Sequence, residues 1–140
     1  MVFGGFRRCL YPYQKFDSDS ERLLALVLED DTACEKWCKP KKGVFRIDYA
    51  SGRAYEPDFI AETAAVKLMI EVKRANQLGD VDVLAKAEAA QIWCGHASEH
   101  EAANGGKPWR YLLIPRDGVS AAASVAGLVG KYAQRGGGKP

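Results

Sequence analysis

Three charged residues, Asp58, Glu71 and Lys73, lie in a stretch that otherwise has the apolar pattern of buried strands. Asp58 follows a proline in the segment YEPDFIAET, and Glu71 and Lys73 are two residues apart in KLMIEVK. Charged groups in such a setting are costly unless they are paired or bound to a metal ion. Two carboxylates beside an ammonium can hold a hydrated Mg²⁺ ion and activate a water molecule for phosphodiester hydrolysis.

A β-hairpin formed by these two segments would bring the three charged groups together. Side chains two apart on a strand point to the same face, so Glu71 and Lys73 are expected to share one. A hairpin symmetric about the Ala64–Ala65 bond places Asp58 opposite Glu71, with Cβ atoms about 4.5–5.5 Å apart. Two such carboxylates repel unless a cation lies between them. An ion pair of Lys73 with Asp58 or Glu71 on a half-exposed sheet face accounts equally well for the spacing.

The elements that would position this hairpin begin with a helix in SDSERLLALVLED, which we expect to extend to about Trp37. Ser18 and Glu21 have the spacing of a capping box at its start. Three strand candidates follow, VFRIDY, AYEPDFIA and VKLMIEV, and their succession predicts a meander.

The second half of the chain predicts a crossover back to the same sheet. An alanine-rich segment from Val81 to about Ala103 predicts a long helix, and residues 109–114 predict a strand parallel to the third one. A last helix is expected near 120–132. The fold class is therefore α/β, a mixed sheet in the order helix, strand, strand, strand, helix, strand, with helices on both faces.

The composition is that of one globular domain, with 140 residues, 47% of them hydrophobic and 27% charged. No apolar run approaches the ~20 residues that a membrane helix needs, and the first residues lack the apolar core of a secretory signal. We therefore expect a cytoplasmic location and no membrane partner, with flexible ends near 1–12 and 134–140.

Basic residues and cysteines allow two further hypotheses. A basic cluster in the middle and a basic tail are typical either of solvated surface or of phosphate contacts; the cluster is Lys36, Lys39, Lys41, Lys42 and Arg46, and the tail is Lys131, Arg135 and Lys139. Cysteines and histidines four residues apart could form a zinc site, but CxxC pairs are missing. Reduced, partly buried thiols are the preferred interpretation.

With these elements in place, Pro57-Asp58 followed by Glu71-Val72-Lys73 resembles the PD-(D/E)XK nuclease superfamily. Five segments taken together are similar to the C-terminal endonuclease domain of the Res subunit of type III restriction enzymes. They are KFDSDSERLLALVLED, Trp37, YEPDFIAET, IEVK and LAKAEAAQIWC, and the similarity extends from about Phe16 to Ile114.

The resemblance implies roles for individual residues. Asp58 and Glu71 would bind Mg²⁺, for which Mn²⁺ can substitute, and Lys73 would assist the attacking water. Glu21 on the first helix would complete the metal site, although it also fits the capping box. Lys86 and Gln91 on the long helix are accessory candidates, which alternatively lie on a solvated face.

The implied activity is metal-dependent endonucleolytic hydrolysis of DNA by a single domain, 1–140. Res subunits carry an ATP-driven motor and work with a modification subunit, so we expect such partners; this chain itself has no GxxxxGK[ST] loop. The alternative is a catalytically silent nucleic-acid-binding or docking module of a larger restriction or helicase complex. Branched DNA or RNA as the substrate, and a homodimer that cuts both strands, also stay open.

Overall fold

The computed structural model describes residues 2–4, 6–11, 13–50, 52–120 and 123–134. Its elements are β1 (Val2–Gly4), β2 (Tyr13–Lys15), α1 (Asp19–Asp30), β3 (Cys34–Cys38), β4 (Ile47–Ala50), β5 (Arg53–Tyr55), β6 (Phe59–Thr63), β7 (Lys67–Lys73), the 3₁₀ turn η1 (Ala75–Gln77), α2 (Val81–Ala103), β8 (Trp109–Pro115), the 3₁₀ turn η2 (Arg116–Gly118), α3 (Val125–Tyr132) and β9 (Ala133–Gln134). The flexibility predicted for residues 135–140 lies outside the described residues.

A mixed sheet in the order β3-β6-β7-β8-β9 forms the centre of the molecule. β7 and β8 pair in parallel, and the other neighbours pair antiparallel. α2 makes the connection from β7 to β8, as the sequence predicts for a parallel pair. The predicted mixed α/β architecture is confirmed.

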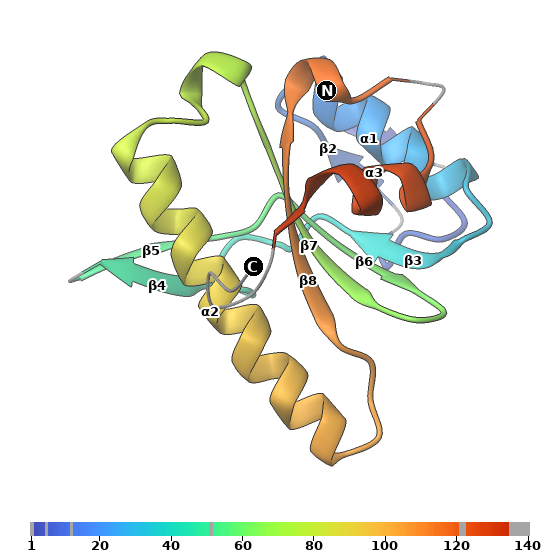
Figure 1. Cartoon of the computed structure of the whole chain (residues 1–140). Coiled ribbons are helices and arrows are strands. Elements are labelled where there is room, and N and C mark those ends of the chain that lie inside the picture. Colours follow the sequence, from blue (N-terminus) through green and yellow to red (C-terminus); the bar gives the residue numbers. More distant parts are fainter. Residues whose placement is uncertain (1, 5, 12, 51, 121–122, 135–140) are drawn as a thin grey trace.

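Two hydrophobic clusters cover the two faces of this sheet. Figure 1 shows β7 and β8 between α2 on one side and α1 and α3 on the other. Leu68, Ile70 and Val72 of β7 pack with α1 and α3, whereas Met69 packs with α2 and the β4–β5 hairpin. The alternation of β7 therefore directs its odd-numbered residues, including Glu71 and Lys73, toward the α2 side.

The first helix is shorter than predicted. α1 ends at Asp30, and Cys34–Cys38, predicted as its last turns, form strand β3 at the edge of the sheet. The Asp31 side chain accepts a hydrogen bond from Ala33 N at 2.9 Å, a local turn that competes with helix. Acidic residues also disfavour a helix C-terminus, where the dipole is negative.

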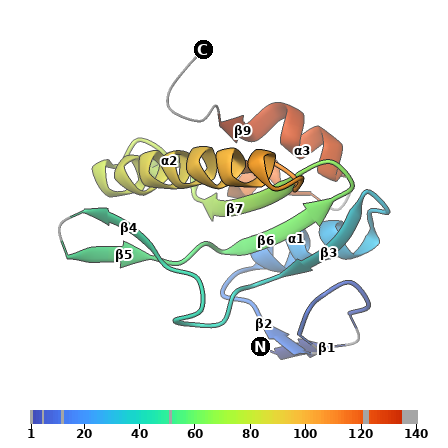
Figure 2. The ribbon, with the colours of Figure 1, turned by 90° about the horizontal axis from the view of Figure 1, so that it is seen from below.

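The predicted three-strand meander is also wrong in its first member. Within the described part of the chain, β4 pairs only with β5, in a separate two-stranded hairpin, and β3 takes the place next to β6. The predicted strand AYEPDFIA is divided at Glu56-Pro57, because a proline has no N–H to donate to a sheet. Figure 2 shows the β4–β5 hairpin extending away from the main sheet.

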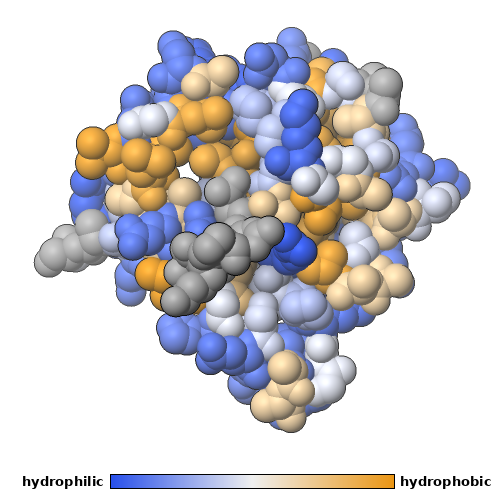
Figure 3. Space-filling view, in the orientation of Figure 1, coloured by the Kyte–Doolittle hydropathy of each residue, from blue (hydrophilic) through white to orange (hydrophobic). Residues whose placement is uncertain are grey.

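The C-terminal half follows the prediction more closely. α2 spans Val81–Ala103 and β8 spans Trp109–Pro115, while α3 begins at Val125, later than expected. The outer face of α2 exposes the apolar residues Val81, Leu84 and Ile92. Figure 3 shows hydrophobic side chains over the N-terminal part of this helix. None of the helices in the described ranges is both long and apolar enough to cross a membrane.

Glu29, near the end of α1, connects the N-terminal segment to strand β3 by hydrogen bonds. Its carboxylate accepts hydrogen bonds from Arg7 N at 2.7 Å, Arg8 N at 3.0 Å and Trp37 Nε1 at 3.1 Å. The Arg8 guanidinium in turn donates to the carbonyls of Glu29 and Asp31, at 2.8 and 2.6 Å. These bonds satisfy carbonyl groups that the end of a helix leaves without partners.

Glu29→Ala should lower the free energy of unfolding by roughly 2–3 kcal/mol, because three donors lose a charged acceptor. Urea unfolding would measure this, with Asp30→Ala as the control, since Asp30 is exposed in the same helical turn. A loss as small as that of Asp30→Ala would contradict the assigned role.

The pH dependence of the same bonds has a defined sign. Burial alone would raise the pKa of Glu29, but the hydrogen bonds from Arg7, Arg8 and Trp37 outweigh it and hold the pKa below its ordinary 4.5. A lowered carboxyl pKa stabilises the fold above the unfolded-state pKa, and this stability disappears as the pH falls through the folded-state pKa. The stability difference between wild type and Glu29→Gln should therefore shrink below about pH 4.5.

Candidate active site

The β6–β7 hairpin has the register that the sequence predicts. Phe59 pairs with Ile70 and Ile60 with Met69, so the same register continued by one residue places Asp58 opposite Glu71. Asp58 lies just before β6, and its Oδ2 accepts a hydrogen bond from Val72 N at 2.9 Å. This bond fixes the Asp58 carboxylate against β7, beside Glu71.

Glu71 is a buried carboxyl group, and one of its two oxygens lacks a hydrogen bond within the described residues. Its relative exposure is 5%, and its Oε1 has no hydrogen-bond partner among the residues that the structure describes. Burial raises the pKa of Glu71 well above its usual value, and the negative charge of Asp58 and a hydrogen bond between the two side chains raise it further. A buried orphan oxygen beside a second carboxylate is a position that a cation would satisfy.

Aromatic and sulfur groups on the α2 side enclose this pair. Tyr55 and Tyr111 are buried, and burial followed by the charge of Glu71 raises the pKa of each phenol. Burial raises the pKa of the Cys94 thiol to about 12, so it is neutral near pH 7. Tyr55 and Tyr111 were not predicted as site residues, although Tyr111 could have been found from the alternation of β8.

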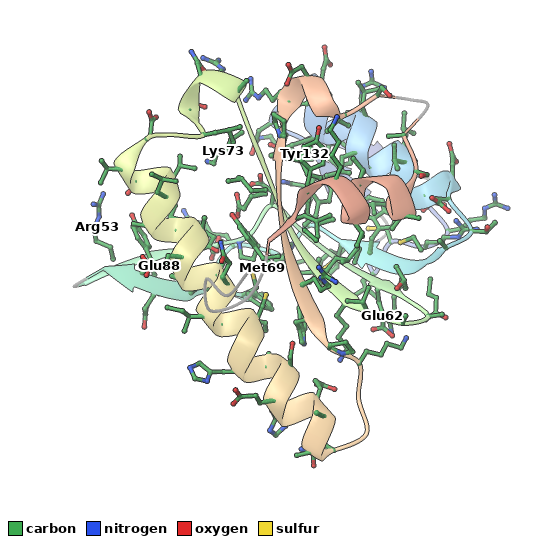
Figure 4. The ribbon with its side chains drawn as sticks, viewed as in Figure 1. Arg53, Glu62, Met69, Lys73, Glu88 and Tyr132 are labelled. Carbon is green, nitrogen blue, oxygen red and sulfur yellow. The ribbon has the colours of Figure 1, made fainter. Side chains whose placement is uncertain are left out.

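Lys73 is the last residue of β7 and is partly buried. Figure 4 shows it near the end of β7 from which the chain runs to α2. Its positive charge opposes the rise in the pKa of Glu71, so it lies close enough to act on that carboxyl. Among the ion pairs of the described residues, none joins Lys73 to Asp58 or Glu71.

Glu21 is positioned by α1 but is held by a different partner. Ser18 caps the helix by accepting a hydrogen bond from Glu21 N at 3.2 Å, as predicted. The Glu21 carboxylate points instead to Lys39, whose Nζ lies 2.6 Å from its Oε1. Lys39 Nζ is also 3.5 Å from the carbonyl oxygen of Asp58. Glu21 thus reaches the neighbourhood of Asp58 through Lys39, which sequence spacing gave no reason to select.

The two accessory candidates on α2 have different surroundings. Lys86 Nζ forms an ion pair with Asp82 at 3.1 Å and lies 6.0 Å from the centroid of the Tyr55 ring. Lys86 is therefore close to Tyr55, the phenol on which the charge of Glu71 acts. Gln91 is partly buried, and no hydrogen bond joins its side chain to the pair among the residues that the structure describes.

The predicted basic cluster is divided among several partners. Lys36 forms an ion pair with Glu62 at 3.9 Å, Lys39 with Glu21, and Lys41 lies over the Tyr11 ring. Lys42 and Arg46 are exposed. In the basic tail, Arg135 and Lys139 lie outside the described residues.

The four cysteines, Cys9, Cys34, Cys38 and Cys94, are free thiols, and all except Cys9 are buried. Cys34 and Cys38, two of the cysteines four residues apart that could have formed a zinc site, lie on strand β3 rather than on a helix.

Asp58 and Glu71 fit a hydrated divalent ion as a pair of ligands. Among the described residues no three His, Cys, Asp or Glu side chains converge on one point. Mg²⁺ nevertheless keeps several waters and is commonly held by only one or two carboxylates together with a substrate phosphate. The orphan Oε1 of Glu71 and the neighbouring Asp58 carboxylate meet that requirement.

The chain matches no protein-family model and no curated protein.

Proposed function

We propose that this chain is a metal-dependent endonuclease domain of the PD-(D/E)XK type that hydrolyses phosphodiester bonds in DNA. The observation that carries the proposal is the buried Glu71 carboxyl beside the partly buried Asp58 carboxylate, with an orphan Glu71 oxygen and with Lys73 at the end of the same strand. A structural role alone does not explain the pair, because a desolvated carboxyl group beside a second carboxylate costs stability. The resemblance to type III restriction Res subunits supports DNA as the substrate.

Each residue of the site has one task in the proposed reaction. Asp58 and Glu71 would hold Mg²⁺, which supplies Lewis-acid activation of water and neutralises charge on the phosphate. The Asp58 carboxylate is kept in place by Val72 N, so it is oriented before the ion binds. Lys73 orients the attacking water and offsets the negative charge that develops on the phosphate. Tyr55 and Tyr111 keep bulk water away from the inner side of the pair.

The proposal includes partners that the wider resemblance implies. A motor domain would deliver DNA to the site, and a modification subunit would supply sequence recognition. Alone, the domain would cut slowly and without sequence preference.

The test combines metal binding with cleavage. Mn²⁺ is titrated into the metal-free protein by calorimetry, and supercoiled plasmid is incubated with high protein concentrations in Mg²⁺ or Mn²⁺. One Mn²⁺ bound per chain, together with metal-dependent nicking that EDTA stops, supports the proposal. Absence of Mn²⁺ binding would overturn it, since binding of the ion does not depend on the right substrate.

A second function, a catalytically silent nucleic-acid-binding module, has one observation in its favour. The third expected ligand, Glu21, is already paired with Lys39, so the site offers two carboxylates rather than three. Under this alternative the protein binds DNA with a steep dependence on salt concentration but does not cut it under any metal.

A further inference from the structure

The pairing of Glu21 with Lys39 has the features of a cation site filled by a side chain. The distance between Lys39 Nζ and Glu21 Oε1 is 2.6 Å, and the side chains are only 17% and 10% exposed. The same ammonium lies 3.5 Å from the Asp58 carbonyl oxygen and 5.0 Å from the centroid of the Phe59 ring. A carboxylate, a carbonyl and an aromatic face therefore surround one positive charge.

These groups are of the kind that bind a divalent ion. Carboxylate and backbone carbonyl oxygens are hard ligands suited to Mg²⁺ or Mn²⁺. Asp58 links the two places, because its carbonyl faces Lys39 while its carboxylate lies beside Glu71. A cation in the position of the Lys39 ammonium would thus be the neighbour of an ion held by Asp58 and Glu71.

We infer that Lys39 is a built-in cation of the active site, which keeps Glu21 from acting as a metal ligand and limits the site to one divalent ion. The inference rests on the proposed function, because it assumes that Asp58 and Glu71 bind that ion. Lys39 acts as a positioning residue: it holds Glu21 of α1 and the Asp58 backbone together at the start of β6.

Two substitutions separate the charge of Lys39 from the carboxylate that it holds. Lys39→Ala removes the ammonium and opens space beside Glu21 and the Asp58 carbonyl, so a second Mn²⁺ should bind. Lys39→Arg keeps the charge and should keep the stoichiometry at one. Glu21→Gln in the wild-type background removes no ligand, so the affinity for Mn²⁺ should fall by at most about a hundredfold, the upper end for residues behind the ligands.

The double variant Lys39→Ala/Glu21→Gln decides where the added ion binds. It should return to one Mn²⁺ per chain, because the second ion needs the Glu21 carboxylate. Circular dichroism confirms that each variant is folded before titration, and Glu21→Gln serves as the test if Lys39→Ala does not fold.

Calorimetric titration of Mn²⁺ distinguishes all the outcomes. The inference is supported by one ion in wild type and Lys39→Arg, two in Lys39→Ala, and one in the double variant. It is overturned, with the proposed function intact, if Glu21→Gln weakens binding by more than about a hundredfold, beyond the loss expected for a residue behind the ligands. It is equally overturned if folded Lys39→Ala binds one ion. If wild type binds none, the proposed function fails and this inference falls with it.

Discussion

Asp58→Asn is expected to weaken Mn²⁺ binding by about a hundredfold or more and to abolish metal-dependent nicking of plasmid, because it removes a charged ligand. Asparagine has the same shape and keeps an oxygen that can accept the hydrogen bond from Val72 N, so the hairpin should stay intact. Glu71→Gln should have the same effect on metal binding. The control is Glu88→Gln, since Glu88 is exposed on α2 (Figure 4) and should not affect binding.

Asp58→Asn should also stabilise the metal-free protein. In wild type the folded-state pKa of Glu71 is raised, so the folded protein retains a proton that the unfolded chain releases. Its stability therefore falls as the pH rises from the unfolded-state pKa toward the folded-state pKa. Asp58→Asn removes the neighbouring charge and should flatten this fall.

Urea unfolding between pH 5 and 8 with EDTA measures the effect. In EDTA, Asp58→Asn should be more stable than wild type. Saturating Mn²⁺ should make wild type the more stable protein, because a free ion concentration of 100 times Kd adds about 2.7 kcal/mol to the free energy of unfolding of wild type alone. Unchanged Mn²⁺ affinity in both Asp58→Asn and Glu71→Gln would mean that the ion, if bound, is held elsewhere.

Lys73→Ala should separate metal binding from catalysis. An ammonium cannot ligate a cation, and its removal takes a like charge away from the ion, so Mn²⁺ affinity should be retained or increased. Cleavage of supercoiled plasmid in Mg²⁺ should nevertheless fall by about 10²–10⁴-fold, the range for loss of a positioned acid–base group.

The appropriate control is Lys42→Ala, which removes an exposed lysine outside the site. If Lys73→Ala nicks plasmid as fast as wild type, the mechanism is wrong even though the metal site stands. If neither protein cuts and both bind DNA with strong salt dependence, the silent module becomes the better description.

The local parts of the site were predictable from the sequence. The alternation of β6 and β7 fixed which face their side chains share, and the short loop fixed the register that sets Asp58 against Glu71. The helix α2 was equally predictable from the sequence, because a long alanine-rich segment without proline strongly favours an α-helix.

The parts that depend on distant contacts were not predictable. The end of α1 is stabilised by Arg8, which reaches it from another segment, and β3 exists because β6 offers an edge. The partner of Glu21 was missed for the same reason, since Lys39 follows β3 and reaches α1 only once the sheet has formed. The capping-box spacing identified the helix start correctly but not the direction of the Glu21 side chain.

The parallel pairing of β7 with β8 has a consequence for the order of folding. Asp58 and Glu71 belong to one hairpin of low contact order, so we expect them to approach each other early in folding, while still hydrated. Tyr111, which helps to enclose them, joins only after the long α2 crossover has closed, and closing a long loop is entropically slow. We therefore expect desolvation of Glu71 to be a late event, so that its energetic cost is met in the final stage of folding rather than in the folding nucleus.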